Sequence, residues 1–154
     1  MSVAPADFKQ ALGRFLSGVT VVATEVDGVV HGMTASAFLS VSLDPPLVLV
    51  SVAKKAKMHE HLSGARHWSA TILAGDQSAL SNHFAGYGDA DVRWETEAGQ
   101  APVLAGGLAW VRCEAFAAHD AGDHTLYVGR VVACGYEERE PLSYFRGKYR
   151  TLAP

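Results

Sequence analysis

The residues between positions 32 and 38 are the first place in this sequence where side-chain type and spacing suggest chemistry. They are small or hydroxyl-bearing, and they lie between two segments with strong β propensity. Because little side-chain bulk would cover such a backbone, a planar heterocycle could lie flat against its N–H and hydroxyl groups. The same composition also suits a strand at which two β layers approach closely. The residues alone leave both interpretations open.

Two further segments carry positive charge in a setting that could bind phosphate. Lys54, Lys55 and Lys57 follow an apolar strand pattern and begin a short helical pattern, whose first amides would add to the positive field. The tail Tyr144-Phe145-Arg146-Gly147-Lys148-Tyr149-Arg150 is both basic and aromatic, so it could cover a stacked nicotinamide and its phosphates. The alternatives are a solvated lysine run for the first segment and a strand pairing across a dimer for the second.

A third candidate is His124, which follows Gly122 and Asp123 at the expected mouth of a long strand. An imidazole there could meet a pyridine nucleotide or assist the delivery of a proton. An isolated surface histidine is the simpler alternative.

Several other kinds of site are not expected. The sequence lacks a GxxxxGK[ST] loop, a GxGxxG turn and a GxSxG elbow. His59 and His61 lie two positions apart on a predicted helix, so their side chains would diverge and no metal site is predicted. A formal net charge of −3 without a basic stripe argues against a nucleic-acid partner.

The location also follows from composition. No apolar run is long enough to cross a membrane, and the N-terminus does not resemble a signal peptide. We expect Cys113 and Cys134 to be buried free thiols in a reducing compartment, and the cytoplasm is the default location.

The pattern along the chain predicts a single domain, residues 1–154, that is mainly β. Helices are expected at 7–16, 57–62 and 78–84, the last capped by Asp76. Strands are expected at 19–26, 29–34, 38–43, 47–52, 68–73, 108–118 and 125–134. Asp27-Gly28 predicts a hairpin turn, the segment 47–52 is apolar enough for burial on both faces, and 87–107 reads as a loop or lid. Six or seven strands joined by tight turns indicate an antiparallel sheet closed into a barrel, with short helices flanking it.

Taken in order, these landmarks resemble the flavin reductase family, the small flavin-binding split barrels with a Greek-key-like antiparallel sheet. The resemblance covers nearly the whole chain, and its most specific part is the segment Ser40-Val41-Ser42-Leu43-Asp44-Pro45-Pro46. The other matching landmarks are Gly18-Val19-Thr20-Val21-Val22, Gly32-Met33-Thr34-Ala35-Ser36-Ala37-Phe38, Phe84-Ala85-Gly86, Gly122-Asp123-His124 and Phe145-Arg146-Gly147.

The resemblance implies a role for particular residues. A flavin, FMN or FAD, would be bordered by Thr34, Ala35, Ser36, Ala37 and Phe38, with Ser51, Val52 and Ala53 beneath the ring and ribityl chain. Lys57 and Met58 would form the phosphate turn, and Phe84, Ala85 and Gly86 would approach the flavin tail. His124, the catalytic candidate, would line the nicotinamide side with Arg146 and Tyr149. Met58 departs from the hydroxyl residue common in the family, which leaves Lys57 and backbone amides for the phosphate.

The activity that the resemblance implies is hydride transfer from NADH or NADPH to FMN or FAD, with reduced flavin passed to a partner monooxygenase. The family also forms homodimers with the flavin near the subunit interface. The alternative is a non-enzymatic flavin-binding or electron-transfer protein on the same barrel. A relative of the haem- or pyridoxamine-phosphate-handling split barrels is a more distant third possibility.

Overall fold

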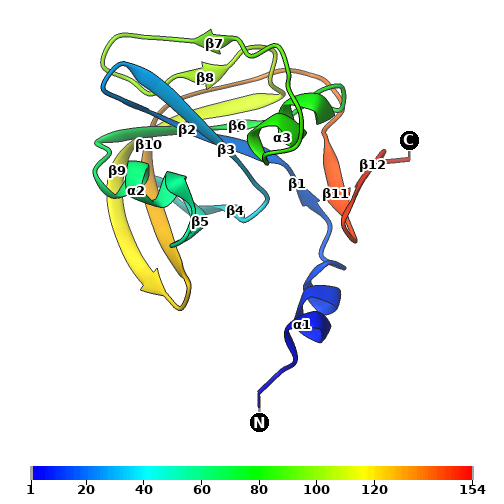
Figure 1. The fold of residues 1–154 in the computed structure, drawn as a ribbon. Helices are drawn as coiled ribbons and strands as arrows, with labels where there is room; N and C mark the ends of the chain where they lie inside the picture. Colours follow the sequence, from blue (N-terminus) through cyan, green and yellow to red (C-terminus); the bar gives the residue numbers. More distant parts are fainter. Residues whose placement is uncertain (1, 154) are drawn as a thin grey trace.

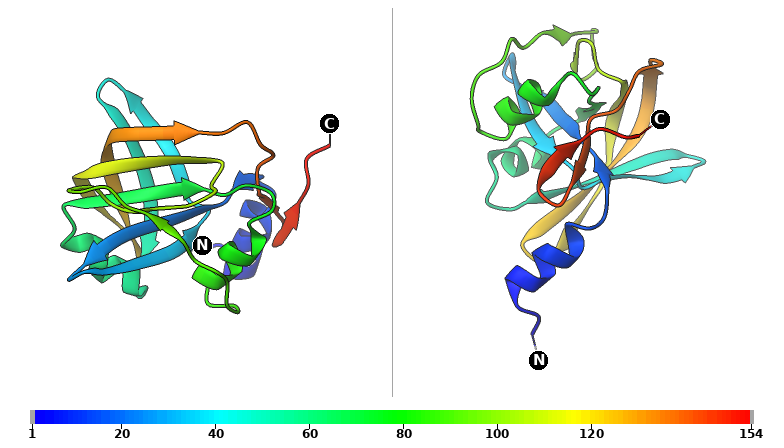
Figure 2. Two further views of the ribbon diagram at one scale, coloured as in Figure 1. Left: turned by 90° about the horizontal axis from the view of Figure 1, so that it is seen from above. Right: turned by 90° about the vertical axis from the view of Figure 1, so that its right-hand side faces the viewer.

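A strongly curved antiparallel sheet of seven strands forms the body of the protein in the computed structural model, which describes residues 2–153 (Figure 1). The strands follow the order β3-β2-β6-β9-β10-β5-β4, and Figure 2 shows how the sheet wraps round on itself. A link between its two ends comes from the Ser51 N–H, which donates to the Ala37 carbonyl over 3.0 Å. The bounds of the seven strands are β2 Thr20–Val26, β3 Val29–Ala35, β4 Phe38–Leu43, β5 Pro46–Ala53, β6 His67–Ile72, β9 Ala109–Ala121 and β10 His124–Tyr136.

The hairpin turns show why the register is fixed. Asp27 and Gly28 have φ values of 51° and 80°, the two left-handed positions of a tight two-residue turn, as predicted. The hairpin between β9 and β10 is tighter than the expected strands 108–118 and 125–134 imply, since Ala121 pairs with His124 and the loop contains only Gly122 and Asp123. The extra pairing carries both long strands to the turn and places His124 on a strand end.

Two helices pack against the sheet and divide the core into two clusters. Helix α2, Lys57–Ser63, inserts Met58 and Leu62 into a cluster with Val52, Trp68 and Tyr127. Helix α3, Ser78–Phe84, lies over a second cluster that includes Val21, Leu73, Leu104 and Leu142. Both helices were predicted nearly residue for residue, because their apolar spacing and the glycines after them are clear signals. The predicted cap is wrong: Asp76 pairs with Arg139 and no side chain caps α3.

The C-terminal segment forms a small separate sheet beside α3. Strand β1, Ser17–Gly18, pairs with β11, Ser143–Phe145, and β11 pairs with β12, Lys148–Arg150. Figure 1 shows this sheet beside α3, with helix α1, Pro5–Leu12, projecting beyond it. The predicted first helix ran to residue 16, but the regular helix ends at Leu12 and none of its residues is buried.

Three further expectations need correction. Strand β5 is buried on alternate residues, not on both faces, because it lies in an antiparallel sheet that is covered on one side. The expected loop over 87–107 contains the paired strands β7, Trp94–Glu95, and β8, Val103–Leu104, and both residues of β8 are buried. Cys113 is buried as predicted, and burial raises the pKa of its thiol to about 12, but Cys134 is exposed.

Candidate functional site

A cleft of about 560 Å³ lies between α3, the end of β3 and the β11–β12 hairpin. It unites three segments that are far apart in the sequence, and it includes four residues of the predicted site: Thr34, Ser36, Ala85 and Tyr149. Its other lining residues are Val19, Ser81, Asn82, Tyr87, Tyr144, Gly147 and Lys148. Aromatic rings and hydroxyl groups dominate this wall, a lining suited to a planar polar ligand.

The predicted flavin segment contributes to this cleft unevenly. The Thr34 hydroxyl donates to the Ser81 carbonyl over 2.6 Å, so its proton is already used. Ala35 is buried, and its carbonyl accepts from the Thr20 hydroxyl over 2.7 Å. Phe38 packs against the core. These three residues therefore shape the segment, and the exposed groups belong to Ser36 and Ala37.

Ser36 and Ala37 supply the donors that a flavin requires. Within residues 2–153, neither of their backbone N–H groups has a protein acceptor, and the Ser36 hydroxyl has no hydrogen-bond partner. An isoalloxazine edge presents carbonyl and ring-nitrogen acceptors, and backbone donors there stabilise the charge of the reduced ring. The donor set of this segment therefore fits the group.

His124 lies outside the cleft, beside the second predicted flavin segment, residues 51–53. It pairs with Ala53 at the end of β5, and Leu126 pairs with Ser51. The His124 Nδ1 is 2.7 Å from Asp123 Oδ1, and this hydrogen bond, with the charge of the imidazole, lowers the pKa of the Asp123 carboxyl. Because the Ser51 amide also bonds to Ala37, β5 connects the His124 end of the site to the cleft.

The phosphate segment is only partly available to a ligand. Lys57 is exposed at the start of α2, whereas the side chains of Val52 and Met58 are in the core and could offer only backbone groups. Lys54 forms an ion pair with Asp120 on the neighbouring hairpin. The cationic character predicted here therefore comes from side chains at the surface.

Other predicted residues lie outside the cleft. The Phe84 ring packs against Trp94, with centroids 5.6 Å apart, and a Cβ at Gly32 would lie 2.6 Å from the Phe84 ring. Gly86, with φ of 92°, has a left-handed conformation just after α3, so the chain changes direction before Tyr87. Arg146 is at the tip of its hairpin, where its N–H donates to the Gly13 carbonyl.

Sequence reasoning missed Ser81, Asn82 and Tyr87 as lining residues, whereas Tyr144 belongs to the predicted basic and aromatic tail. The available signal was the pair of polar residues on the inner side of a short amphipathic helix. A polar pair of this kind acquires meaning only when a partner segment faces it, and that partner is the C-terminal hairpin, more than 60 positions away.

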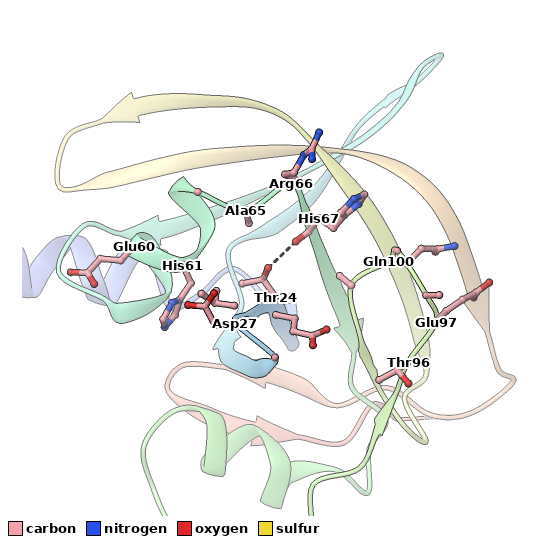
Figure 3. Close-up of a pocket in the computed structure, with 17 residues that line it drawn as sticks. Thr24, Asp27, Glu60, His61, Ala65, Arg66, His67, Thr96, Glu97 and Gln100 are labelled. Carbon is pink, nitrogen blue, oxygen red and sulfur yellow. Dashed lines mark hydrogen bonds between the residues drawn. The ribbon is translucent and has the colours of Figure 1, made fainter.

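A larger hollow of about 870 Å³ lies at another part of the surface and includes none of the predicted site residues (Figure 3). The turn at Asp27, the end of α2 and the loop after β7 form its walls. Four carboxylates line it against one arginine, a balance that repels the phosphates of a dinucleotide. The lining acids are Glu25, Asp27, Glu60 and Glu97, and the arginine is Arg66.

The histidines of α2 have different partners. His59 Nε2 is 2.9 Å from the Thr125 hydroxyl, while the His61 ring stacks on His31 with centroids 3.8 Å apart. Among the described residues, no group of three metal-ligating side chains gathers in one place. No helix within residues 2–153 is both long and apolar enough to span a bilayer.

Comparison with known proteins identifies the class to which this fold and cleft belong. The family model described as "Flavin reductase like domain" matches residues 12–153. A Rhodococcus protein named NADH-dependent flavin reductase is 48% identical over 155 residues, covering 97% of this chain and 88% of the relative. The reductase component of 4-hydroxyphenylacetate 3-monooxygenase from Thermus thermophilus is 44% identical, covering 94% and 95%.

A solved structure gives the same answer for the fold. The flavin reductase PheA2 in its native state superposes with a TM-score of 0.95 at 45% identity, covering 99% of this chain and 100% of that one. The chain therefore belongs to the flavin reductase-like family.

Proposed function

We propose that this protein is an NADH-dependent flavin reductase that supplies reduced flavin to a separate monooxygenase. The observation that carries the proposal is the cleft at the end of β3, where Ser36 offers free donors beside an aromatic wall and the adjoining Ala37 amide is also free among the described residues. The similarity to reductases and to a monooxygenase reductase component supports the same conclusion. A bound flavin would accept a hydride from the reduced nicotinamide.

The flavin side of the site is assigned to two segments. The amides of Ser36 and Ala37 and the Ser36 hydroxyl would meet the polar edge of the ring, and Ser51 and Ala53 would support it along β5. Lys57 would approach the phosphate. The protein acts mainly by orientation, which can contribute about 7–11 kcal/mol to lowering a barrier between two bound reactants.

The nicotinamide side is assigned to His124 and Tyr149, with Arg146 near the outer edge. Asp123 holds the Nδ1 side of the His124 ring, which leaves Nε2 free to contact the nucleotide. The Tyr149 ring forms part of the cleft wall. No side-chain nucleophile is required for hydride transfer.

The assembly and location are further parts of the proposal. The apolar side chains of Phe8, Leu12 and Phe15 are more than half exposed, which favours a homodimer that covers them. We propose one domain, because strands β2 to β6, β9 and β10 share one sheet and β1 pairs with the C-terminal hairpin. The unpaired thiols of Cys113 and Cys134 suit a reducing compartment such as the cytoplasm.

The direct test mixes the purified protein with NADH and either FMN or FAD and follows nucleotide oxidation in air and without oxygen. We expect oxidation well above that of the flavin alone, with NADH preferred over NADPH. Protein that binds flavin but does not oxidise either nucleotide would contradict the proposal and favour a non-enzymatic flavin protein.

The phosphate assignment has its own test. Lys57→Ala should weaken the binding of FMN more than that of riboflavin, since only FMN carries the charge that Lys57 would meet. Fluorescence titration of both ligands measures this, with Lys9→Ala as a control at an exposed lysine on α1. An unchanged ratio of the two affinities would place the phosphate elsewhere.

A further inference from the structure

The main chain of the C-terminal hairpin that walls the cleft has few hydrogen bonds to the rest of the protein, one of which runs from the Arg146 N–H to the Gly13 carbonyl. Among residues 2–153, strand β12 pairs only with β11, and β11 pairs with β1 through two residue pairs. An edge strand of three residues is not held in place by its ladder alone. The position of Tyr149, the central residue of β12, must therefore depend on other contacts.

The Tyr149 ring packs against the second core cluster and lies 5.6 Å from the Tyr144 ring, and its hydroxyl contacts α3. It donates to Asn82 Oδ1 over 2.9 Å and lies 2.6 Å from Ser81 Oγ. A phenol hydroxyl has one proton to donate, and Tyr149 donates it in the hydrogen bond to Asn82. Ser81 must therefore be the donor in the second hydrogen bond. Both the proton of Tyr149 and one of its lone pairs are then engaged by α3.

Ser81 is well placed to act as a fixed support. It is buried, with 1% of its surface exposed, and its carbonyl accepts the Thr34 hydroxyl over 2.6 Å. The same residue thus bonds to β3 through its backbone and to β12 through its side chain. Both elements contribute to the cleft lining, β3 through Thr34 and β12 through Tyr149.

We propose that Ser81 is a positioning residue for the reductase reaction, because its buried hydroxyl holds the Tyr149 ring against the nucleotide side of the cleft. This inference rests on the proposed function. Tyr149 then acts through its ring face and not as an acid, since its hydroxyl already donates a hydrogen bond to Asn82 Oδ1. Removing the Ser81 hydroxyl takes away one of the two hydrogen bonds of the Tyr149 hydroxyl and touches no reacting atom, while the hydrogen bond to Asn82 and the packing of the ring remain.

The test compares Ser81→Ala, Ser81→Thr and Tyr149→Phe in steady-state kinetics and in calorimetric titration with NAD⁺. For Ser81→Ala we expect the KM for NADH and the Kd for NAD⁺ to rise about two- to tenfold, as for one lost neutral hydrogen bond. The kcat should change by less than about twofold, the behaviour of an interaction present equally in ground and transition states. Ser81→Thr keeps a hydroxyl and should restore most of the affinity.

A double-mutant cycle separates positioning from a general structural effect. Once Tyr149 is Phe, adding Ser81→Ala should weaken NAD⁺ binding much less than it does in the wild-type protein. Ser78→Ala, on the same helix and without a side-chain hydrogen bond among the described residues, is the control and should leave the Kd unchanged. Melting temperatures of all variants confirm that each is folded.

Two outcomes would overturn the inference while leaving the proposed function intact. One is an active wild-type enzyme in which Ser81→Ala binds NAD⁺ as tightly as Ser78→Ala does. The other is full additivity in the cycle. A wild-type protein that does not oxidise NADH with flavin would instead refute the proposed function, and the NAD⁺ titration would still report on Ser81.

Discussion

His124 is the side chain for which the structure adds most to the sequence. Its position on a strand end, paired with Ala53, and its hydrogen bond to Asp123 give it a defined ring orientation. A carboxylate on Nδ1 favours the tautomer with its proton on that nitrogen. Asp123 is almost fully exposed, so the contribution of this pair to folding is small. We therefore expect the Asp123–His124 hydrogen bond to affect nucleotide binding and catalysis more than stability.

His124→Ala should therefore lower kcat/KM for NADH about a hundredfold, the lower end of the range for a positioned acid–base group, and change flavin affinity little. Steady-state kinetics with each substrate varied, together with flavin fluorescence titration, measures both effects. His119→Ala, at an exposed histidine on β9, is the matched control. Equal losses of nucleotide and flavin affinity would show that His124 is assigned to the wrong ligand.

At the scale of elements, the joint between β3 and α2 contains a titratable pair. His31 on β3 stacks on His61 on α2, and the pKa of His31 is lowered, first by burial and then by the charge of His61. The unfolded chain consequently binds a proton at a higher pH than the folded protein does. Stability from this joint is present above about pH 6.5 and decreases as the pH falls below that value.

His31→Phe keeps an aromatic ring in the stack and removes the titration. We expect the decrease in Tm between about pH 7.5 and pH 5.5 to be smaller in this variant than in the wild type. Thermal unfolding followed by circular dichroism measures it, with His119→Gln as the control. If both variants lose as much Tm as the wild type, the pair does not contribute to acid sensitivity.

The close contact of three strands around Gly129 gives a second prediction at this scale. A Cβ at this residue of β10 would lie 2.6 Å from the Trp68 ring and 2.7 Å from Cys113 Cβ. Both neighbours are buried and cannot move without opening the core. Gly129→Ala should therefore reduce the free energy of unfolding by about 1–3 kcal/mol.

Urea unfolding measures this effect, and Gly18→Ala is its control. A Cβ at Gly18 would meet nothing within 4 Å, so that substitution should not destabilise the protein. If Gly129→Ala were as stable as Gly18→Ala, the packing of Trp68 against β10 would be looser than the structure shows.

At the scale of the whole molecule, the stability of α1 is not explained by contacts within one chain, since none of its residues is buried. It projects away from the barrel in Figures 1 and 2, and the Phe15 side chain just after it is 79% exposed. An isolated helix of eight residues is marginal in water without tertiary packing. A second copy of the chain would supply that packing.

Phe15→Lys should therefore shift the protein from twice the mass of the chain toward the monomer. Analytical ultracentrifugation over a range of concentrations measures the shift. Tyr136→Lys, at an equally exposed aromatic residue on β10, should not change the mass. A wild-type protein that sediments as a monomer would contradict the proposed dimer.

Local patterns were sufficient to predict much of this protein. The turn at Asp27 and Gly28, the helices α2 and α3, and the antiparallel strand order of the hairpins follow from short-range signals that report backbone conformation directly. The same signals failed where the environment decides the outcome. The apolar run of β5 alternates in burial, and the presumed loop after α3 places Val103 in the core.

For the candidate site, too, local patterns predicted one part and the three-dimensional environment decided the other. Residue types and spacings were enough to predict which segments could carry the chemistry, because small residues, hydroxyls and a histidine beside a tight turn can be seen in the chain. Which of these side chains are free to bind depends on their contacts in the folded protein. The Thr34 hydroxyl donates to the Ser81 carbonyl, and Met58 is buried in the core. Tyr149 contacts Asn82 on α3, 67 positions away in the sequence. Hydrogen bonds and burial depend on which atoms meet in space, and spacing along the chain does not contain that information.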